Sequence, residues 1–295
     1  MIHSNATPED GITGYAFDHT QGPACALACA ASTVWRNYFV TVEGETGQRA
    51  DRQLNTLEDL QKRLPAGLLN VRNGYSSSPD VASLSRAVDA LSEDAADDLR
   101  ESLRVGVQWD AEVTDCRESY AKGPDGAPPG VAAIRPEDRA TFGSRAGWAT
   151  RRETCAPVTQ VFSSALALGS TRQLREWRPL AQLILDAAYD ACLCAARLNA
   201  ARGGSRRVYL TLLGGGAFGN DIEWIVSAMR RALARHADSG LTVIVVEHGR
   251  APWTPKFTAL AGRWTADGPE AGSGGADGTA EGARPERPRI NFFDS

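Results

Sequence analysis

The chain has 295 residues, 42% of them hydrophobic, and a formal net charge of −4, a composition that supports one large domain or two small ones. No Lys/Arg-rich run stands out, which argues against nucleic acid as a partner. No stretch approaches the roughly 18–20 apolar residues of a membrane span, and the first residues resemble neither a signal peptide nor a transit helix. Without a secretory signal, the six cysteines indicate reduced thiols in an intracellular protein, so a cytoplasmic location is expected and a nuclear one stays open.

The first half of the chain predicts mainly helices. A helix of very small residues is expected from Thr20, which can cap it, through residue 39, with Pro23 in its first turn. Leucines at helical spacing predict helices over residues 54–64 and 80–104, and VGVQW at 105–109 predicts a strand. Residues 117–153 have scattered Pro and Gly without an apolar period, so they are expected to form a partly disordered insertion.

The second half alternates between strands and helices. We expect strands over 158–168, 208–213 and 241–248 and helices over 177–200 and 221–236, with the 208–213 strand buried on both faces. Such alternation predicts a largely parallel sheet covered by helices. Residues 266–295 have too little apolar content to fold and are expected to be a flexible low-complexity tail, which leaves a single domain over residues 1–265.

A glycine-rich loop follows one of these strands. In RVYLTLLGGGAFGNDIEWIV (residues 207–226), four of six residues, Gly214, Gly215, Gly216 and Gly219, are glycines. They permit close approach of a ligand to the backbone, and Asn220 or Asp221 can cap the next helix, with Glu223 completing a capping box. Free amides at a helix N-terminus bind anions, so the loop predicts a phosphate or nucleotide site. A tight strand-to-helix turn is the simpler alternative.

The loop also fits a dinucleotide-binding motif. Gly214, Gly216 and Gly219 match G-x-G-x-x-G, and Glu247 ends the next strand, where an acid could bind a ribose. An oxidoreductase dependent on NAD(P) is therefore the third hypothesis. Its weakness is that only one strand is expected after the loop, whereas such folds continue for several more βα units.

Residues 155–249 resemble the C-terminal half of a macrodomain. The resemblance rests on the order of a helix with Tyr189–Ala196, the strand 208–213, the glycine loop, the following helix and the strand 242–246. The stretch VTQVFSSAL stands where that family has its central strand. The resemblance implies a three-layer α/β/α fold with a mixed, largely parallel sheet that binds ADP-ribose.

The resemblance also implies a ligand site. Its first wall is the glycine loop, which would hold the diphosphate and distal ribose. Its opposite wall would correspond to the stretch from Asp18 to Pro23 and the following helix, where the family carries an asparagine-bearing loop after an early strand. Either this site is rebuilt here or the sequence begins late. The expected ligand residues are Gly214, Gly215, Gly216, Ala217, Phe218, Gly219, Asn220, Gln21, Gly22, Arg36 and Asn37.

Whether the expected site is catalytic is left open by the sequence. Some macrodomains only bind ADP-ribose, whereas others hydrolyse ADP-ribosyl linkages, and Asp18 is the candidate to orient the attacking water. A turn explains Asp18-His19 as well, and a helix C-terminus explains Arg36-Asn37. The expected partner is an ADP-ribose-like small molecule or an ADP-ribosylated protein, with no cofactor. A non-catalytic scaffold or interaction module with a rewritten ligand site is the second hypothesis.

The cysteines give no metal motif. Cys25 and Cys29 share a helix face, but no His or Cys pair near them completes a site, and Cys192 and Cys194 point to different helix faces. No metal site was therefore expected.

Overall fold

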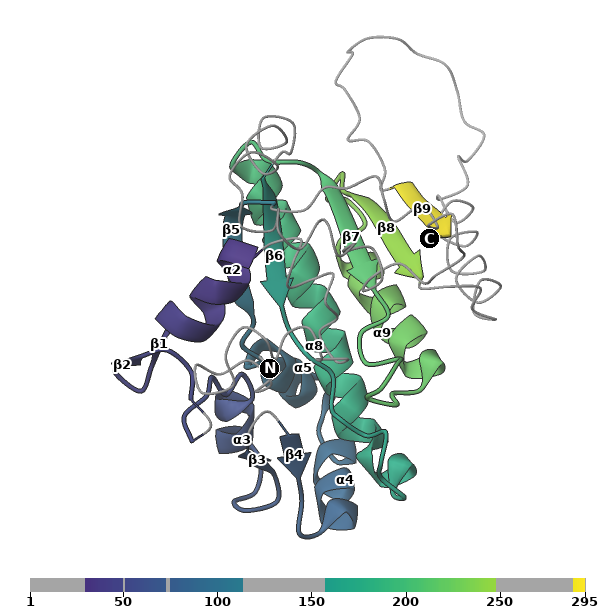
Figure 1. The fold of residues 1–295 in the computed structure, drawn as a ribbon. Helices are drawn as coiled ribbons and strands as arrows, with labels where there is room; N and C mark the ends of the chain where they lie inside the picture. Colours follow the sequence, from purple (N-terminus) through teal and green to yellow (C-terminus); the bar gives the residue numbers. More distant parts are fainter. Residues whose placement is uncertain (1–29, 50, 73–74, 114–156, 248–288, 295) are drawn as a thin grey trace, which may run out of the picture. The chain divides into compact units, whose positions relative to one another are not determined.

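The computed structural model describes residues 30–49, 51–72, 75–113, 157–247 and 289–294 (Figure 1). The chain divides into two compact units where a single domain was expected. The first unit comprises Met1–Asn55, Arg72–Gly74 and Gly106–Phe162, and the second comprises Thr56–Val71, Tyr75–Val105 and Ser163–Ser295. The described part contains both helices and strands, so the fold is of the mixed α/β class. The expected insertion at 117–153 lies outside the described residues.

The first unit is built from short elements. They are α2 (Ala30–Val34), the π-helix η2 (Trp35–Phe39), β1 (Thr41–Val42), β2 (Glu45–Thr46), β5 (Gly106–Ala111) and β6 (Val158–Phe162). The strands form two antiparallel pairs, β1 with β2 and β5 with β6, and the second pair is irregular between Gln108 and Ala111. The small-residue helix expected from Thr20 is described only from residue 30 onward.

The second unit contains the longer helices. Its elements are α3 (Glu58–Arg63), β3 (Asn70–Arg72, whose last residue belongs to the first unit), β4 (Tyr75–Ser77), α4 (Val81–Asp89), α5 (Glu93–Glu101), α8 (Leu174–Ala201), β7 (Arg207–Thr211), α9 (Ile222–Arg235), β8 (Thr242–Glu247) and β9 (Arg289–Asp294). The helix expected over 80–104 is two helices. The break occurs because Ser92 caps a new helix, its hydroxyl accepting a hydrogen bond from the Ala95 amide at 3.3 Å.

The largest sheet that the structure describes in the second unit has three parallel strands, in the order β7-β8-β9. The expected strand–helix–strand alternation is confirmed from α8 to β8 (Figure 1). The strand placed by the resemblance at the centre of this sheet does not belong to it, because β6 ends at Phe162 and pairs with β5. The expectation that the 208–213 strand is buried on both faces was also wrong. As an edge strand, β7 alternates between buried and exposed side chains, and Tyr209 is 60% exposed.

Residues 289–294, within the expected tail over residues 266–295, form a strand; the rest of that tail lies outside the described residues. Residues 289–294 form β9, whose backbone pairs in parallel register with all six residues of β8, from Thr242 with Arg289 to Glu247 with Asp294. The dinucleotide hypothesis was weakened by the expectation that only one strand follows the glycine loop. Two strands, β8 and β9, follow it in the structure.

Helix α8 is the centre of the second unit's core. It packs against α9, α4 and α5, and its largest fully buried side chains are Leu180, Ile184, Leu185 and Leu193. By length and composition alone α8 could cross a membrane, although 61% of its most apolar window is buried within the protein. This differs from the expectation that no stretch is long and apolar enough to span a membrane. The burial of α8 is that of a core helix.

Candidate functional site

The glycine loop Gly214–Asn220 leads from the carboxyl end of β7 to the N-terminus of α9. Asp221 is the N-cap of that helix, and its Oδ1 atom accepts a hydrogen bond from the Glu223 amide at 2.8 Å. Of the two predicted caps, Asn220 and Asp221, the structure has Asp221, and Glu223 is then one residue too close to complete the expected capping box. The carboxyl end of a parallel strand followed by a helix N-terminus is where open α/β sheets bind their ligands.

Two of the loop glycines are required by the turn itself. Gly214 and Gly219 have φ angles of +77° and +64°, which residues with a side chain rarely adopt. A Cβ atom at Gly214 would lie 2.4 Å from the Cβ of Ala165, and a Cβ at Gly219 would lie 2.7 Å from the Cα of Gly169. The alternative of a tight turn therefore explains these two positions.

A second segment, residues 165–169, packs along the loop. The Leu168 amide donates to the Phe218 carbonyl at 2.7 Å. The Nδ2 atom of Asn220 donates to the Leu166 carbonyl at 2.8 Å, and this asparagine side chain is buried. A Cβ atom at Gly169 would lie 2.3 Å from the Ala217 carbonyl oxygen, so Gly169 belongs to the same packing. Sequence analysis missed Gly169, since a single glycine outside any motif gives no signal.

Tyr189 fixes the strand end that precedes the loop. From α8, its hydroxyl donates to the Thr211 carbonyl at 2.7 Å and accepts from the Leu213 amide at 2.9 Å. Burial raises the pKa of the phenol well above its ordinary value, so the hydroxyl stays protonated. The resemblance marked Tyr189 only as part of a helix, whereas the structure shows that it positions the loop.

The tip of the loop is open. Gly215, Gly216 and Ala217 are exposed, and a Cβ atom at Gly216 would meet nothing within 4 Å. The Gly215 amide is used within the turn, donating to the Leu212 carbonyl at 3.0 Å. Within the described part of the chain, the amides of Gly216 and Ala217 have no acceptor. These two adjacent amides are therefore free to bind a ligand or solvent.

The residues of the predicted opposite wall lie either outside the described residues or in the other unit. Asp18, Gln21 and Gly22 lie outside the described residues. Arg36 and Asn37 belong to the first unit. There the Arg36 guanidinium carbon lies 4.2 Å from the ring centroid of Phe162, and the buried Gln48 side chain donates to the Asn37 side-chain oxygen at 3.3 Å. Within the second unit, the loop is therefore the part of the predicted site that the structure describes.

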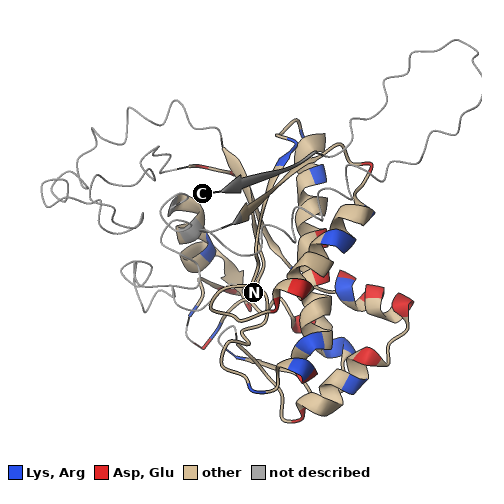
Figure 2. Ribbon diagram, turned by 90° about the vertical axis from the view of Figure 1, so that its right-hand side faces the viewer, with Lys and Arg blue, Asp and Glu red and all other residues tan. Residues whose placement is uncertain are grey.

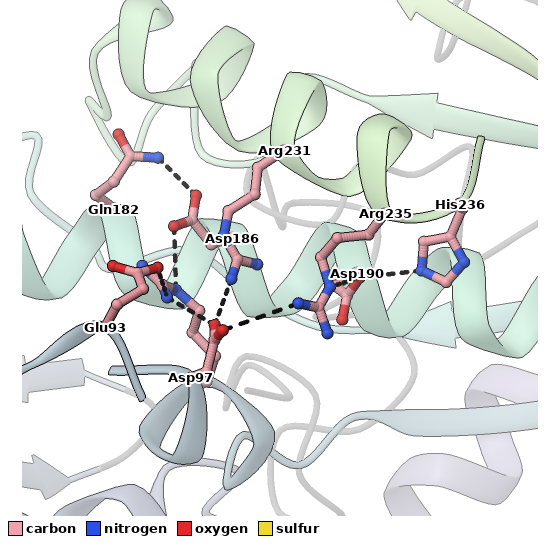
Figure 3. Close-up of polar contacts among 9 residues, drawn as sticks. Glu93, Asp97, Gln182, Asp186, Asp190, Arg231, Arg235 and His236 are labelled. Atoms are coloured by element: carbon pink, nitrogen blue, oxygen red, sulfur yellow. Dashed lines mark hydrogen bonds and ion pairs between the residues drawn. The ribbon is translucent and has the colours of Figure 1, made fainter. Parts of the chain in front are cut away.

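An ion-pair network that sequence analysis missed joins α5, α8 and α9 (Figure 3). Arg100 contacts Asp97 at 2.8 Å and the buried Asp186 at 3.3 Å, and Arg231 also contacts Asp97. Arg100 and the neighbouring arginines of α9 hold the pKa of Asp97 below its usual value, whereas burial raises the pKa of Asp186. Figure 2 shows basic and acidic residues interspersed along these helices. Such pairing is typical of packing between helices.

No protein-family model, curated protein or solved structure matches this sequence.

Proposed function

We propose that the glycine loop Gly214–Asn220 binds the diphosphate of ADP-ribose or a related nucleotide. The observation that carries the proposal is the pair of exposed amides at Gly216 and Ala217, which have no acceptor among the described residues. They precede a 14-residue helix whose N-terminal end carries a partial positive charge. Amide donors next to such a helix end favour phosphate oxygens.

The choice of ligand rests on the loop and on the macrodomain resemblance together. At Gly216 the absence of a side chain leaves the backbone accessible to a phosphate, and Phe218 is the residue that the resemblance sets against the distal ribose. Hydrolysis of an ADP-ribosyl linkage would need a group to orient water at the anomeric carbon, for which Asp18 is the candidate. Binding is therefore the primary proposal, and hydrolysis is a second step to be assayed once binding is established.

Calorimetric titration of the full-length protein with ADP-ribose tests the proposal, with NAD and AMP as comparators. We expect micromolar binding that is specific for ADP-ribose. Gly216→Glu introduces a carboxylate beside the two free amides and should abolish binding. Gly216→Ala is the matched control, since its methyl group enters open space and its affinity should change little. Equal affinity for Gly216→Glu and wild type would refute the assignment of the loop.

A non-catalytic scaffold is the competing function, and the turn geometry favours it. Packing or backbone conformation accounts for Gly214, Gly215 and Gly219, where an added Cβ would lie within 2.4–3.1 Å of a neighbouring atom. A folded wild-type protein that binds none of the three nucleotides would support this alternative. Binding of NAD in preference to ADP-ribose would instead support the dinucleotide hypothesis.

A further inference from the structure

Three side chains with metal-binding atoms converge at the other end of α9. Asp190 and Cys194 lie one turn apart on α8, and His236 is the C-cap of α9. The Nε2 atom of His236 lies 3.0 Å from the Asp190 Oδ1 atom and 3.8 Å from the Cys194 sulfur. One ligand atom from each residue lies within 4.8 Å of the other two. Figure 3 shows Asp190 and His236 directed toward each other.

The spacing fits a tetrahedral ion. Zinc binds histidine nitrogen and carboxylate oxygen at about 2.0–2.2 Å and cysteine sulfur at about 2.3 Å, so neighbouring ligands lie roughly 3.3–3.6 Å apart. The separations of His236 from Asp190 and from Cys194, 3.0 and 3.8 Å, bracket this range, so these two pairs need shifts of a few tenths of an ångström. A Cys/His/Asp set suits zinc, because magnesium and calcium prefer oxygen ligands alone.

The surroundings of the histidine leave its coordinating nitrogen available. His236 is only 6% exposed, and its Nδ1 atom has no hydrogen-bond partner in the structure. Without a cation, the Asp190 carboxylate favours a proton on Nε2. A cation that displaces this proton to the unpartnered Nδ1 atom would gain the lone pair of Nε2 as a ligand. Cys194 is exposed, which gives an ion a path from solvent and leaves room for a water molecule as fourth ligand.

The charges around the cluster are compatible with a divalent cation. Asp190 supplies one negative charge, and a cysteine that binds zinc supplies a second as thiolate. Arg235 contacts Asp190 at 3.2 Å through a side chain that is 43% exposed, so it can move aside. Metal binding must displace the thiol proton, so affinity should increase with pH.

We propose that Asp190, Cys194 and His236 bind a zinc ion that links α8 to the C-terminal end of α9. The site is separate from the glycine loop. Helix α9 has 14 residues, which at 1.5 Å per residue places about 21 Å between its two ends. Because of this distance, the proposal does not depend on nucleotide binding at the loop. Because its ligands come from two helices, the ion would stabilise the packing of α8 against α9.

Metal analysis of the full-length protein tests the site. We expect one zinc ion per chain after equilibration with micromolar zinc and removal of excess, and a thiolate-to-cobalt absorption band when cobalt replaces zinc. Cys194→Ser should weaken zinc binding by more than the ~10–100-fold typical of changes outside the ligand set, and should abolish the cobalt band. Asp190→Asn should weaken zinc binding while keeping the cobalt–thiolate band.

Cys192→Ser is the matched control. Cys192 lies two residues away on α8, outside the cluster, and burial raises the pKa of its thiol to about 11. This variant should retain one zinc ion and the cobalt band. A chelator should lower the thermal midpoint of wild type and Cys192→Ser but not that of Cys194→Ser. A wild type that retains no zinc, or a Cys194→Ser variant that binds zinc like wild type, would overturn the proposal. Gly216→Glu should keep the zinc, which separates this test from that of the nucleotide site.

Discussion

Replacing Tyr189 with phenylalanine should destabilise the protein by removing one oxygen atom. The Tyr189 hydroxyl connects α8 to the end of β7, bonding to Thr211 and Leu213 at 2.7 and 2.9 Å. The ring is buried, so water cannot replace the lost partner without opening the packing between helix and strand. Tyr209→Phe is the control, because Tyr209 is 60% exposed.

The size of the stability loss depends on which hydrogen bonds the Thr211 carbonyl and the Leu213 amide keep in the variant. A buried polar group left without its partner costs about 1–3 kcal/mol. Two such groups would double that cost, but the Leu213 amide also donates to the Thr211 carbonyl at 2.9 Å, so neither is fully orphaned. We therefore expect Tyr189→Phe to lower the free energy of unfolding by about 1–3 kcal/mol. At roughly 2–4 °C per kcal/mol, the thermal midpoint falls by about 2–12 °C.

Chemical denaturation and calorimetry of both variants provide the measurement. Tyr209→Phe should stay within about 0.5 kcal/mol of wild type, as expected of surface changes. If Tyr189→Phe is as stable as Tyr209→Phe, the hydroxyl does not hold the end of β7, and the account of how the loop is positioned is wrong.

Three further predictions concern burial and backbone geometry. Arg100→Met removes the cation that contacts the buried Asp186, although Arg231 remains nearby, and should cost about 3 kcal/mol. Burial raises the folded-state pKa of Asp186 above its ordinary value of 3.8 because it disfavours the charged carboxylate. The loss in the variant should therefore grow as rising pH ionises Asp186 in the absence of the Arg100 charge. Arg104→Met, at an exposed ion pair, should be silent in the same denaturation series. Asn220→Asp places a carboxylate against backbone carbonyls, so its stability should be nearest to wild type at acid pH and fall toward pH 7 in thermal scans. Gly214→Ala should lower the unfolding midpoint by combining a positive φ with a clash, which circular dichroism would detect.

Periodicity predicted helices α8 and α9 and strands β7 and β8 of the second unit well. The spacing of apolar residues located α8 to within three residues at one end and one at the other, and α9 to within one at each. These elements bury a continuous stripe, which is the property that periodicity detects. Asp221 was correctly proposed as a cap, because the loop and the helix pattern meet there.

Pairing between strands was much less predictable. β6 has the apolar composition of a central strand, yet it pairs with β5, because pairing depends on partners distant in sequence. β9 was missed because six residues after a Pro- and Gly-rich stretch are too few to give a period. The exposed face of β7 could not be deduced from its sequence, since an apolar run does not show which strand forms the edge.

The candidate site was predicted in part. The motif located the loop, but it could not show that residues 165–169 pack against it and use part of its backbone. The cluster of Asp190, Cys194 and His236 was missed because His236 lies 46 and 42 residues after the two ligands on α8. The search for cysteine and histidine pairs close in sequence does not detect an Asp/Cys pair one helical turn apart.

The parallel pairing of β8 with β9 has a consequence for the order of folding. Helix α8, β7, α9 and β8 follow one another directly in the chain, so their contacts close short loops. Residues 248–288 separate β8 from β9, and closing so long a loop costs entropy before any strand pairing offsets it. We therefore expect β9 to join last. Until β9 pairs with it, β8 has one edge of unpaired backbone groups in a strand of hydrophobic residues. Another chain could pair with this edge, so association between chains would compete with the final step of folding.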